Sequence, residues 1–155
     1  MNRALIIKSN HYELLVIQPL SKRKHMKLKE LLSADTDVVA GVIITVEGKI
    51  LLCLRSKDGS WSIPKGHVQV NETPIQGALR ELSEETDIRL HQDELELVDF
   101  GMRTKSDGTP GMIYLYKHDG AGQYVPKLNL EHEAWGYFTV GNYPEPLDKI
   151  LQGVI

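Results

Sequence analysis

The sequence predicts an α/β protein, a sandwich of helix and strand layers around a mixed β-sheet. Three observations lead to this fold class. The 155 residues, with 41% hydrophobic and 25% charged side chains, have the size and composition of one globular domain. Strand-like apolar runs lie on both sides of a single amphipathic helix. Short turns join several of these runs, as in β-hairpins.

We expect residues 1–36 to form an N-terminal extension that packs on a main domain of residues 37–155. Two strand-like runs, "ALIIKS" and "YELLVIQ", flank "NHY" and predict a hairpin. A basic segment follows at residues 21–32, with five basic residues, one acidic residue and apolar residues at loosely helical spacing.

The strongest strand signal is "VVAGVIITVEGKILLCLRS", which predicts two strands joined by a turn at Glu47 and Gly48. A glycine-containing loop, "KDGSWSIPKGHVQVNE", follows. Further along, "ELELVDFGMRT", "GMIYLYKH" and "AWGYFTV" predict strands, and "YPEPLDKILQGVI" predicts a short closing helix. Cys53, the single cysteine, lies in an apolar run, so we expect a core residue that forms no internal disulfide.

The central helix has a clear predicted start. Thr73 suits the N-cap, Pro74 the first helical position, and Gln76 completes a capping box. Apolar residues then recur at three- and four-residue steps and form a stripe that faces the core: Ile75, Ala78, Leu79 and Leu82.

Three glutamates share another face of this helix: Glu81, Glu84 and Glu85. Like charges one turn apart destabilise an isolated helix by a few tenths of a kcal/mol per pair, roughly. A solvated surface face is the simple interpretation. A bound divalent cation is the alternative, because Mg²⁺ prefers carboxylate oxygens and is completed by phosphates of a substrate. The preceding Gly/Pro loop, the interleaved Arg80 and the nearby Glu72 favour the cation, with Arg80 expected to orient the carboxylates.

This stretch resembles the signature of the Nudix hydrolase family, in which a glycine, a glutamate and an Arg-Glu-x-x-Glu-Glu helix follow at fixed spacing. The matching residues here are Gly66, Glu72, Arg80, Glu81, Leu82, Glu84, Glu85 and Ile88. One position departs, because Asp87 stands where the family has glycine. Asp tolerates a left-handed backbone better than most residues, so we expect only a modest cost in stability.

The resemblance covers residues 37–140 and implies the family's α/β/α sandwich. It implies Mg²⁺-dependent hydrolysis of a phosphoanhydride in a nucleoside diphosphate linked to another group, with Mn²⁺ as the other candidate metal. The implied metal ligands are Glu81, Glu84 and Glu85, the carbonyl of Gly66, and Glu72 through water. The general base stays open between Glu81 and a later loop glutamate, Glu131, with Glu133 second.

Several residues are candidates for substrate contacts. Lys65 can pair with a phosphate as a point charge, or be an ordinary surface lysine. Tyr114 and Trp135, with Tyr116 and Tyr137, offer faces for stacking of a base, although aromatic residues in strands are more often core. We expect His132 to be a solvated loop residue rather than a phosphate donor.

The segment "PKGHV" and the later Glu-His pair most resemble family members that act on dinucleoside polyphosphates. Nucleoside triphosphates, an RNA 5′ end, an ADP-sugar and a non-catalytic nucleotide-sensing module stay open as alternatives. The basic segment can guide RNA through phosphate contacts, form a solvated helix face, or cover a neighbour in a homodimer.

Two classes of protein are disfavoured. No apolar run has the length of a membrane span, and the N-terminal residues lack a secretory pattern, so we expect a cytoplasmic protein without a membrane partner. The six histidines show no HxxxH spacing, which argues against a zinc site.

Overall fold

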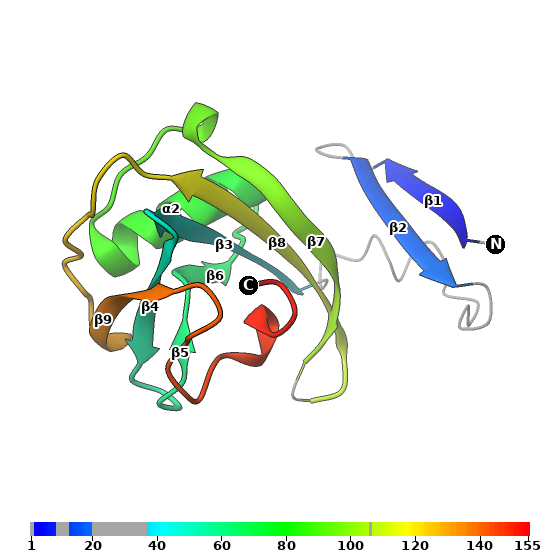
Figure 1. Cartoon of the computed structure of the whole chain (residues 1–155). Helices are drawn as coiled ribbons and strands as arrows, with labels where there is room; N and C mark the ends of the chain where they lie inside the picture. The colour runs from blue at the N-terminus through cyan, green and yellow to red at the C-terminus, as the bar shows by residue number, and fades with distance from the viewer. Residues whose placement is uncertain (1, 9–12, 20–36, 106) are drawn as a thin grey trace.

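The computed structural model describes residues 2–8, 13–19, 37–105 and 107–155, the first two stretches by their backbone alone. Strands β1 (Asn2–Lys8) and β2 (Glu13–Pro19) pair antiparallel as a separate two-stranded sheet (Figure 1). The basic segment lies outside the described residues. Its structure, and the packing of the extension on the main domain, stay predictions.

The main sheet is mixed, as expected for this fold class. Its central strands follow the order β5-β4-β3-β8-β7, with β6 paired to β3 and β9 paired to β4. Strands β3 and β8 run parallel, and the other strand pairs are antiparallel. The strands span β3 (Asp37–Val46), β4 (Lys49–Arg55), β5 (Trp61–Ser62), β6 (Lys65–His67), β7 (Glu96–Thr104), β8 (Pro110–Asp119) and β9 (His132–Thr139).

The predicted turn between β3 and β4 is confirmed. Glu47 and Gly48 have φ angles of 51° and 74°, the left-handed conformation that such a tight turn requires. The two strands pair only beside this turn, at Thr45–Val46 and Lys49–Ile50. Farther along, β6 replaces β4 as the neighbour of β3, while β5 and β9 pair with β4. The sheet therefore divides between β3 and β4.

Helix α2 (Pro74–Thr86) begins and ends as the sequence predicts. The Thr73 hydroxyl accepts a hydrogen bond from the Gln76 amide at 3.3 Å, and the Gln76 side chain accepts one from the Thr73 amide at 2.9 Å. This capping box satisfies amides that the first helical turn leaves without partners. Asp87 ends the helix with φ 58° and ψ 14°, so it adopts the left-handed conformation.

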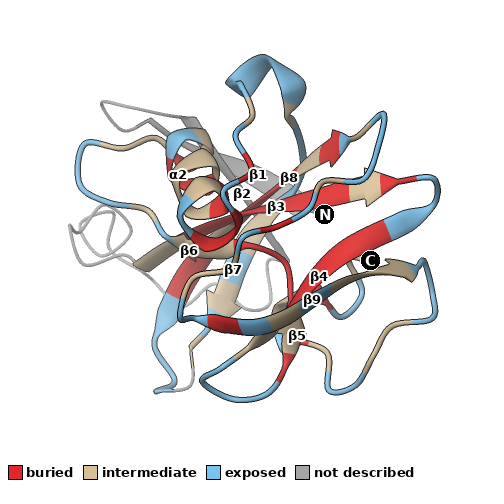
Figure 2. Cartoon of the chain, turned by 90° about the vertical axis from the view of Figure 1, so that its left-hand side faces the viewer, coloured by how far each residue is buried: buried red, intermediate tan, exposed pale blue. Residues whose placement is uncertain are grey.

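Each face of the sheet carries its own apolar cluster. Figure 2 shows that the buried residues lie mostly along the central strands and on part of α2. Ala78 and Leu82 of α2 pack on one face, and the C-terminal segment packs on the other through Leu151 of the 3-10 helix η3 (Lys149–Leu151). The alternation predicted for β8 is confirmed, because alternate residues enter different clusters. Met112, Tyr114 and Tyr116 face α2, whereas Ile113 and Leu115 face the C-terminal segment.

Two expectations need correction. The loop after β4 contains β5 and β6, which exist because they pair with β4 and β3 and not because of any local pattern. The predicted closing helix is a single 3-10 turn, so an α-helix covers one face of the sheet and an irregular segment the other. Cys53 is fully buried as expected, and burial, followed by the charge of Glu85, raises the pKa of its thiol to about 12. Within the described residues, no helix is long and apolar enough to cross a membrane.

Candidate active site

The three helix glutamates differ sharply in exposure. The side chain of Glu84 is 56% exposed and that of Glu81 is 12% exposed. Glu85 is buried, with 2% of the residue exposed. The carboxylates therefore reach from solvent into the protein along one turn of α2, and a simple solvated face does not describe them.

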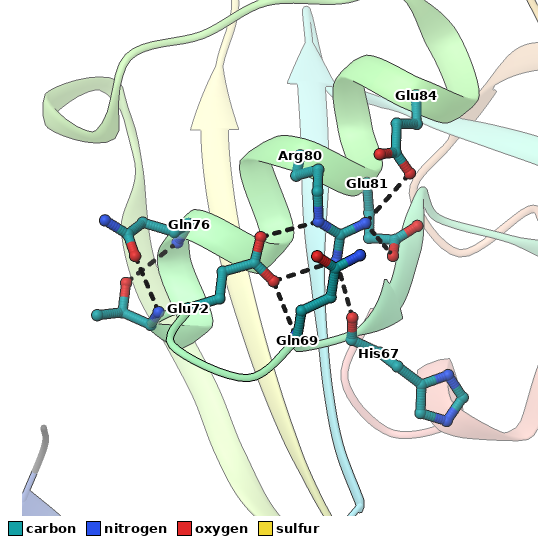
Figure 3. A network of polar contacts seen from close by, with 8 residues as sticks. His67, Gln69, Glu72, Gln76, Arg80, Glu81 and Glu84 are labelled. Atoms are coloured by element: carbon teal, nitrogen blue, oxygen red, sulfur yellow. Dashed lines mark hydrogen bonds and ion pairs between the residues drawn. The ribbon is translucent and has the colours of Figure 1, made fainter.

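Arg80 is the centre of the polar network on this face (Figure 3). Its Nε and Nη2 donate to Glu72 at 2.8 and 3.2 Å. Its Nη1 donates to Glu81 at 2.7 Å and to Glu84 at 3.1 Å. Its Nη2 also donates to the His67 carbonyl at 2.8 Å. One guanidinium therefore ties the helix to β6 and to the preceding loop, which is the orienting contact expected of Arg80.

Glu72 also binds Arg80 and holds its guanidinium in place. The hydrogen bond from Arg80 is the main cause that lowers the pKa of Glu72, and the Gln69 amide adds a second bond at 2.9 Å. Gly77 lies against this carboxylate, since a Cβ there would come within 3.1 Å of Glu72 Oε2. The loop and the first turns of α2 are thereby joined around an ionised glutamate.

Glu85 turns inward toward β6. Its Oε2 accepts a hydrogen bond from the Lys65 amide at 3.0 Å. Burial, then repulsion by Glu81, raises the pKa of Glu85 to about 8, and Glu131 adds to the increase. Burial also raises the pKa of Glu81, against the opposing effect of Arg80. Both carboxyl groups therefore lack enough positive charge nearby to favour full ionisation.

Gly66 explains how Glu81 fits beside β6. Any Cβ at residue 66 would collide with the Glu81 carboxylate. The glycine thus lets a carboxylate and a backbone carbonyl come close together. Carboxylate and carbonyl oxygens are the ligand types of Mg²⁺ and Mn²⁺.

The chemistry of these groups fits a divalent cation. Oxygen donors from Glu81, Glu84, Glu85 and Gly66 lie on adjoining elements. A cation would offset both the burial and the neighbouring negative charges that raise the pKa of Glu81 and Glu85. Among the residues described, no three acidic, histidine or cysteine side chains already converge as a cluster suited to a metal. Glu81 and Glu84 instead accept hydrogen bonds from Arg80.

A cleft of about 460 Å³ adjoins Glu85 at the division of the sheet. It is lined by residues from β4, β6, α2 and the loop before β9: Arg55, Ser56, Lys57, Ile63, Lys65, Glu85, Leu130, Glu131 and His132. Glu85 and Glu131 therefore line the cleft together with three cationic side chains, those of Arg55, Lys57 and Lys65. This is the concave site in which a phosphorylated ligand can approach the glutamates.

The loop that carries Glu131 is fixed at both ends. The Lys127 amide donates to the Thr86 carbonyl at 2.8 Å, which joins the loop to the end of α2. The Ser56 amide donates to the Glu131 carbonyl at 2.8 Å, and its hydroxyl donates to the Leu130 carbonyl at 3.1 Å. Glu131 lies close enough to Glu81 and Glu85 to raise the pKa of both.

Three other candidate residues from the sequence do not line the cleft: Tyr114, Trp135 and Glu133. Tyr114 is 7% exposed and stacks on Phe100 within the core beneath α2. Trp135 is 36% exposed and makes an edge contact with Tyr137. Neither is among the residues that line the cleft, and a role in stacking a base stays a prediction for both. Glu133 is exposed.

The prediction of a solvated His132 is wrong, because this residue is only 8% exposed. Its Nδ1 is buried without a hydrogen-bond partner, and burial lowers the pKa of the ring. The local sequence suggested an exposed loop, but strand β9 begins at this residue and pairs it with Arg55 of β4.

The sequence did not point to Arg55, Ser56 and Lys57, which line the cleft, or to Asp148, which contacts two of the lining side chains. Asp148 binds Lys65 Nζ at 3.0 Å and Arg55 Nη1 at 3.3 Å. Nothing in the local sequence links these positions, since residues 55 and 148 are brought together only by packing of the C-terminal segment.

The chain is similar to known proteins of one family. The family model for the NUDIX domain matches residues 35–154. A MutT-like protein from Streptomyces ambofaciens is 30% identical over 112 residues, which cover 72% of this chain and 69% of that protein. Other relatives are longer. An m7GpppN-mRNA hydrolase of Xenopus laevis is 36% identical over a stretch that covers 49% of this chain and 28% of that protein.

Solved structures show the same fold. A MutT NUDIX hydrolase from Burkholderia pseudomallei superposes with a TM-score of 0.68 at 27% identity, covering 76% of this chain and 94% of that one. An Ap4A hydrolase of C. elegans, solved as a binary complex, superposes with a TM-score of 0.54 at 25% identity over 67% of this chain and 80% of that one. The chain therefore belongs to the Nudix family, and it is a Nudix pyrophosphohydrolase.

Proposed function

We propose that the protein hydrolyses a phosphoanhydride bond of a dinucleoside polyphosphate, with Mg²⁺ or Mn²⁺ as its cofactor. The cleft carries this proposal, because Glu85 and Glu131 line it together with Arg55, Lys57 and Lys65. A chain of several phosphates carries closely spaced negative charges. Arg55, Lys57 and Lys65 can neutralise some of these charges, and the glutamates would hold metal ions that neutralise others.

The residues divide into distinct roles. Glu81, Glu84, Glu85 and the Gly66 carbonyl would hold the metal, with Glu72 as a ligand through water. Arg80 orients the carboxylates and Glu72 fixes Arg80. The metal would supply charge neutralisation at the leaving phosphate and a water of lowered pKa. Lys65 and Arg55 bind phosphate oxygens, and Trp135, which has an exposed ring, stacks on a base. The buried Tyr114 suits that role less well.

We assign Glu131 as the general base. Glu81 already packs against Gly66 and accepts a hydrogen bond from Arg80, which suits a metal ligand. Glu131 lies on a loop that is tethered to both α2 and β4 and lines the same cleft as Glu85. A carboxylate held in this way can accept the proton of the attacking water without moving a metal ligand.

An RNA 5′ end is the second candidate substrate. The resemblance to an mRNA hydrolase and the five basic residues of segment 21–32 favour it. Replacing Lys22, Arg23, Lys24 and Lys27 with neutral residues should then slow cleavage of RNA and weaken its dependence on salt. Unchanged turnover of RNA by this variant would exclude a role for the segment.

The decisive experiment is a panel of hydrolyses in Mg²⁺ with analysis of the products. It compares dinucleoside polyphosphates, nucleoside triphosphates, ADP-ribose, NADH and 5′-triphosphate RNA for wild type, Glu84→Gln and a control at an exposed glutamate of β7, Glu96→Gln. We expect the highest kcat/KM on a dinucleoside polyphosphate, and loss of turnover in Glu84→Gln alone. A higher kcat/KM on any other substrate would overturn the proposed specificity.

A further inference from the structure

Asp148 is a buried acid of the C-terminal segment, 8% exposed, that contacts two residues of the cleft wall, Lys65 and Arg55. Its Oδ2 lies 3.0 Å from Lys65 Nζ and 3.3 Å from Arg55 Nη1, and it accepts a hydrogen bond from the Ser62 hydroxyl at 2.9 Å. Three groups from three positions therefore meet at one carboxylate oxygen.

The backbone holds Asp148 in this place. Its amide donates to the Trp61 carbonyl at 2.8 Å, and the Trp61 amide donates to the Pro146 carbonyl at 2.8 Å. Its Oδ1 accepts a hydrogen bond from the Ile150 amide at 3.1 Å. The carboxylate is therefore fixed to β5 and to the 3-10 turn, and it does not depend on the two cations for its position.

Lys65 lies between two acids. Its backbone amide binds Glu85 Oε2 at 3.0 Å, while its ammonium binds Asp148 at 3.0 Å. Burial raises the pKa of Glu85, and the charge of Lys65 opposes that increase. Burial also disfavours ionisation of Asp148, but the charge and hydrogen bond of Lys65 help to lower its pKa below the ordinary value. The ammonium is thus within electrostatic reach of both carboxylates and bonds to one of them.

We propose that Asp148 is a positioning residue: it holds the Lys65 ammonium and the Arg55 guanidinium on the wall of the cleft and so keeps Lys65 from pairing with Glu85. The inference rests on the proposed role of Glu85 as a metal ligand. A Lys65–Glu85 ion pair would occupy an oxygen that the metal needs and would remove a cation from the phosphate chain.

The test compares Asp148→Asn with wild type for binding of Mn²⁺ alone, measured by calorimetry or electron paramagnetic resonance without substrate. Asn keeps the shape of the side chain and an oxygen for Ser62, but it removes the charge that attracts Lys65. We expect Mn²⁺ affinity to fall by about tenfold, as for other residues that support metal ligands. KM for the nucleotide substrate should rise as well, because the cations lose their anchor.

Two further variants separate positioning from simple stability. Asp58→Asn is the matched control, because Asp58 binds Arg55 at 3.1 Å from the exposed side, and it should leave Mn²⁺ affinity unchanged. The double variant Asp148→Asn with Lys65→Met lacks the competing ammonium and should recover Mn²⁺ affinity to within about twofold of wild type. A double variant that had lost its fold would not recover Mn²⁺ affinity. Thermal unfolding of each variant tests directly whether it is folded.

Equal Mn²⁺ affinity in wild type and Asp148→Asn would overturn the inference, as would a double variant no better than Asp148→Asn. Failure of the proposed function is a separate result. In that case wild type binds Mn²⁺ and the variants behave as expected, but no dinucleoside polyphosphate is cleaved.

Discussion

Gly66 has no side chain, and this absence makes room for the Glu81 carboxylate beside β6. The Glu81 carboxylate occupies the space that a Cβ would fill, so the absence of a side chain at Gly66 sets the position of this carboxylate. Two inner acids, Glu81 and Glu85, are placed in this way against β6. Burial is the main cause that raises the pKa of both; nearby carboxylates add to it, Glu81 for Glu85 and Glu84 for Glu81, while Arg80 opposes the increase at Glu81.

Gly66→Ala should lower kcat by about 100-fold, because a displacement of roughly 1 Å in a catalytic group has that effect. The added methyl must push Glu81 away from β6, while the fold stays intact. Steady-state kinetics measures kcat, and circular dichroism checks that the fold is intact. Gly122→Ala is the control, since nothing lies within 4 Å of a Cβ there. Equal kcat in the two variants would show that Glu81 is free to move.

Glu85 should make stability of the metal-free protein depend on pH. Its pKa is about 8 in the folded protein and 4.5 ordinarily, so the folded state holds a proton that the unfolded state has lost. This contribution is complete below pH 4.5 and disappears as pH rises toward 8. Urea unfolding in EDTA should therefore show a steeper loss of stability with pH for wild type than for Glu85→Gln. Identical pH slopes would contradict the buried, protonated state.

At the scale of elements, α2 is defined by local chemistry at both ends. Thr73, Pro74 and Gln76 start it, and Asp87 ends it in a left-handed conformation with φ 58°. The sequence alone was sufficient for these features, because capping depends on residues only three or four positions apart.

Asp87→Gly should stabilise the protein by up to about 1 kcal/mol, since glycine adopts the left-handed region without strain. Activity should not change, because the Asp87 carboxylate lies 3.5 Å from Arg89 and takes no part in the Arg80 network. Denaturant unfolding and kcat/KM test this together, with Asp87→Ala as the destabilising comparison. A less stable glycine variant would mean that the Asp87–Arg89 contact outweighs the backbone effect.

For the whole molecule, the C-terminal segment acts as the second layer of the sandwich. Leu151 is fully buried against Ile43, Leu52 and Leu115 of the sheet. The same segment brings Asp148 to Lys65 and Arg55, so packing of the last residues also positions two cations of the cleft.

Leu151→Ala should lower the free energy of unfolding by about 2–5 kcal/mol, because it leaves a cavity in the core. Chemical denaturation provides the value, and Leu130→Ala is the control because Leu130 is 96% exposed. If Leu151→Ala were as stable as Leu130→Ala, the second cluster would not contribute to folding.

The sequence by itself determined the helix, its ends, the central hairpin, the facing of alternate residues in β8 and the set of acids around Arg80. All of these depend on residues close together in the chain, where spacing and side-chain type are sufficient. Only the tertiary structure decided the parallel pairing of β3 with β8, the short strands β5 and β6, the burial of His132 and the contact of Asp148 with Lys65 and Arg55. These features join positions far apart in sequence, and their energy comes from packing and hydrogen bonds that exist only when the sheet and both of its covering layers are assembled.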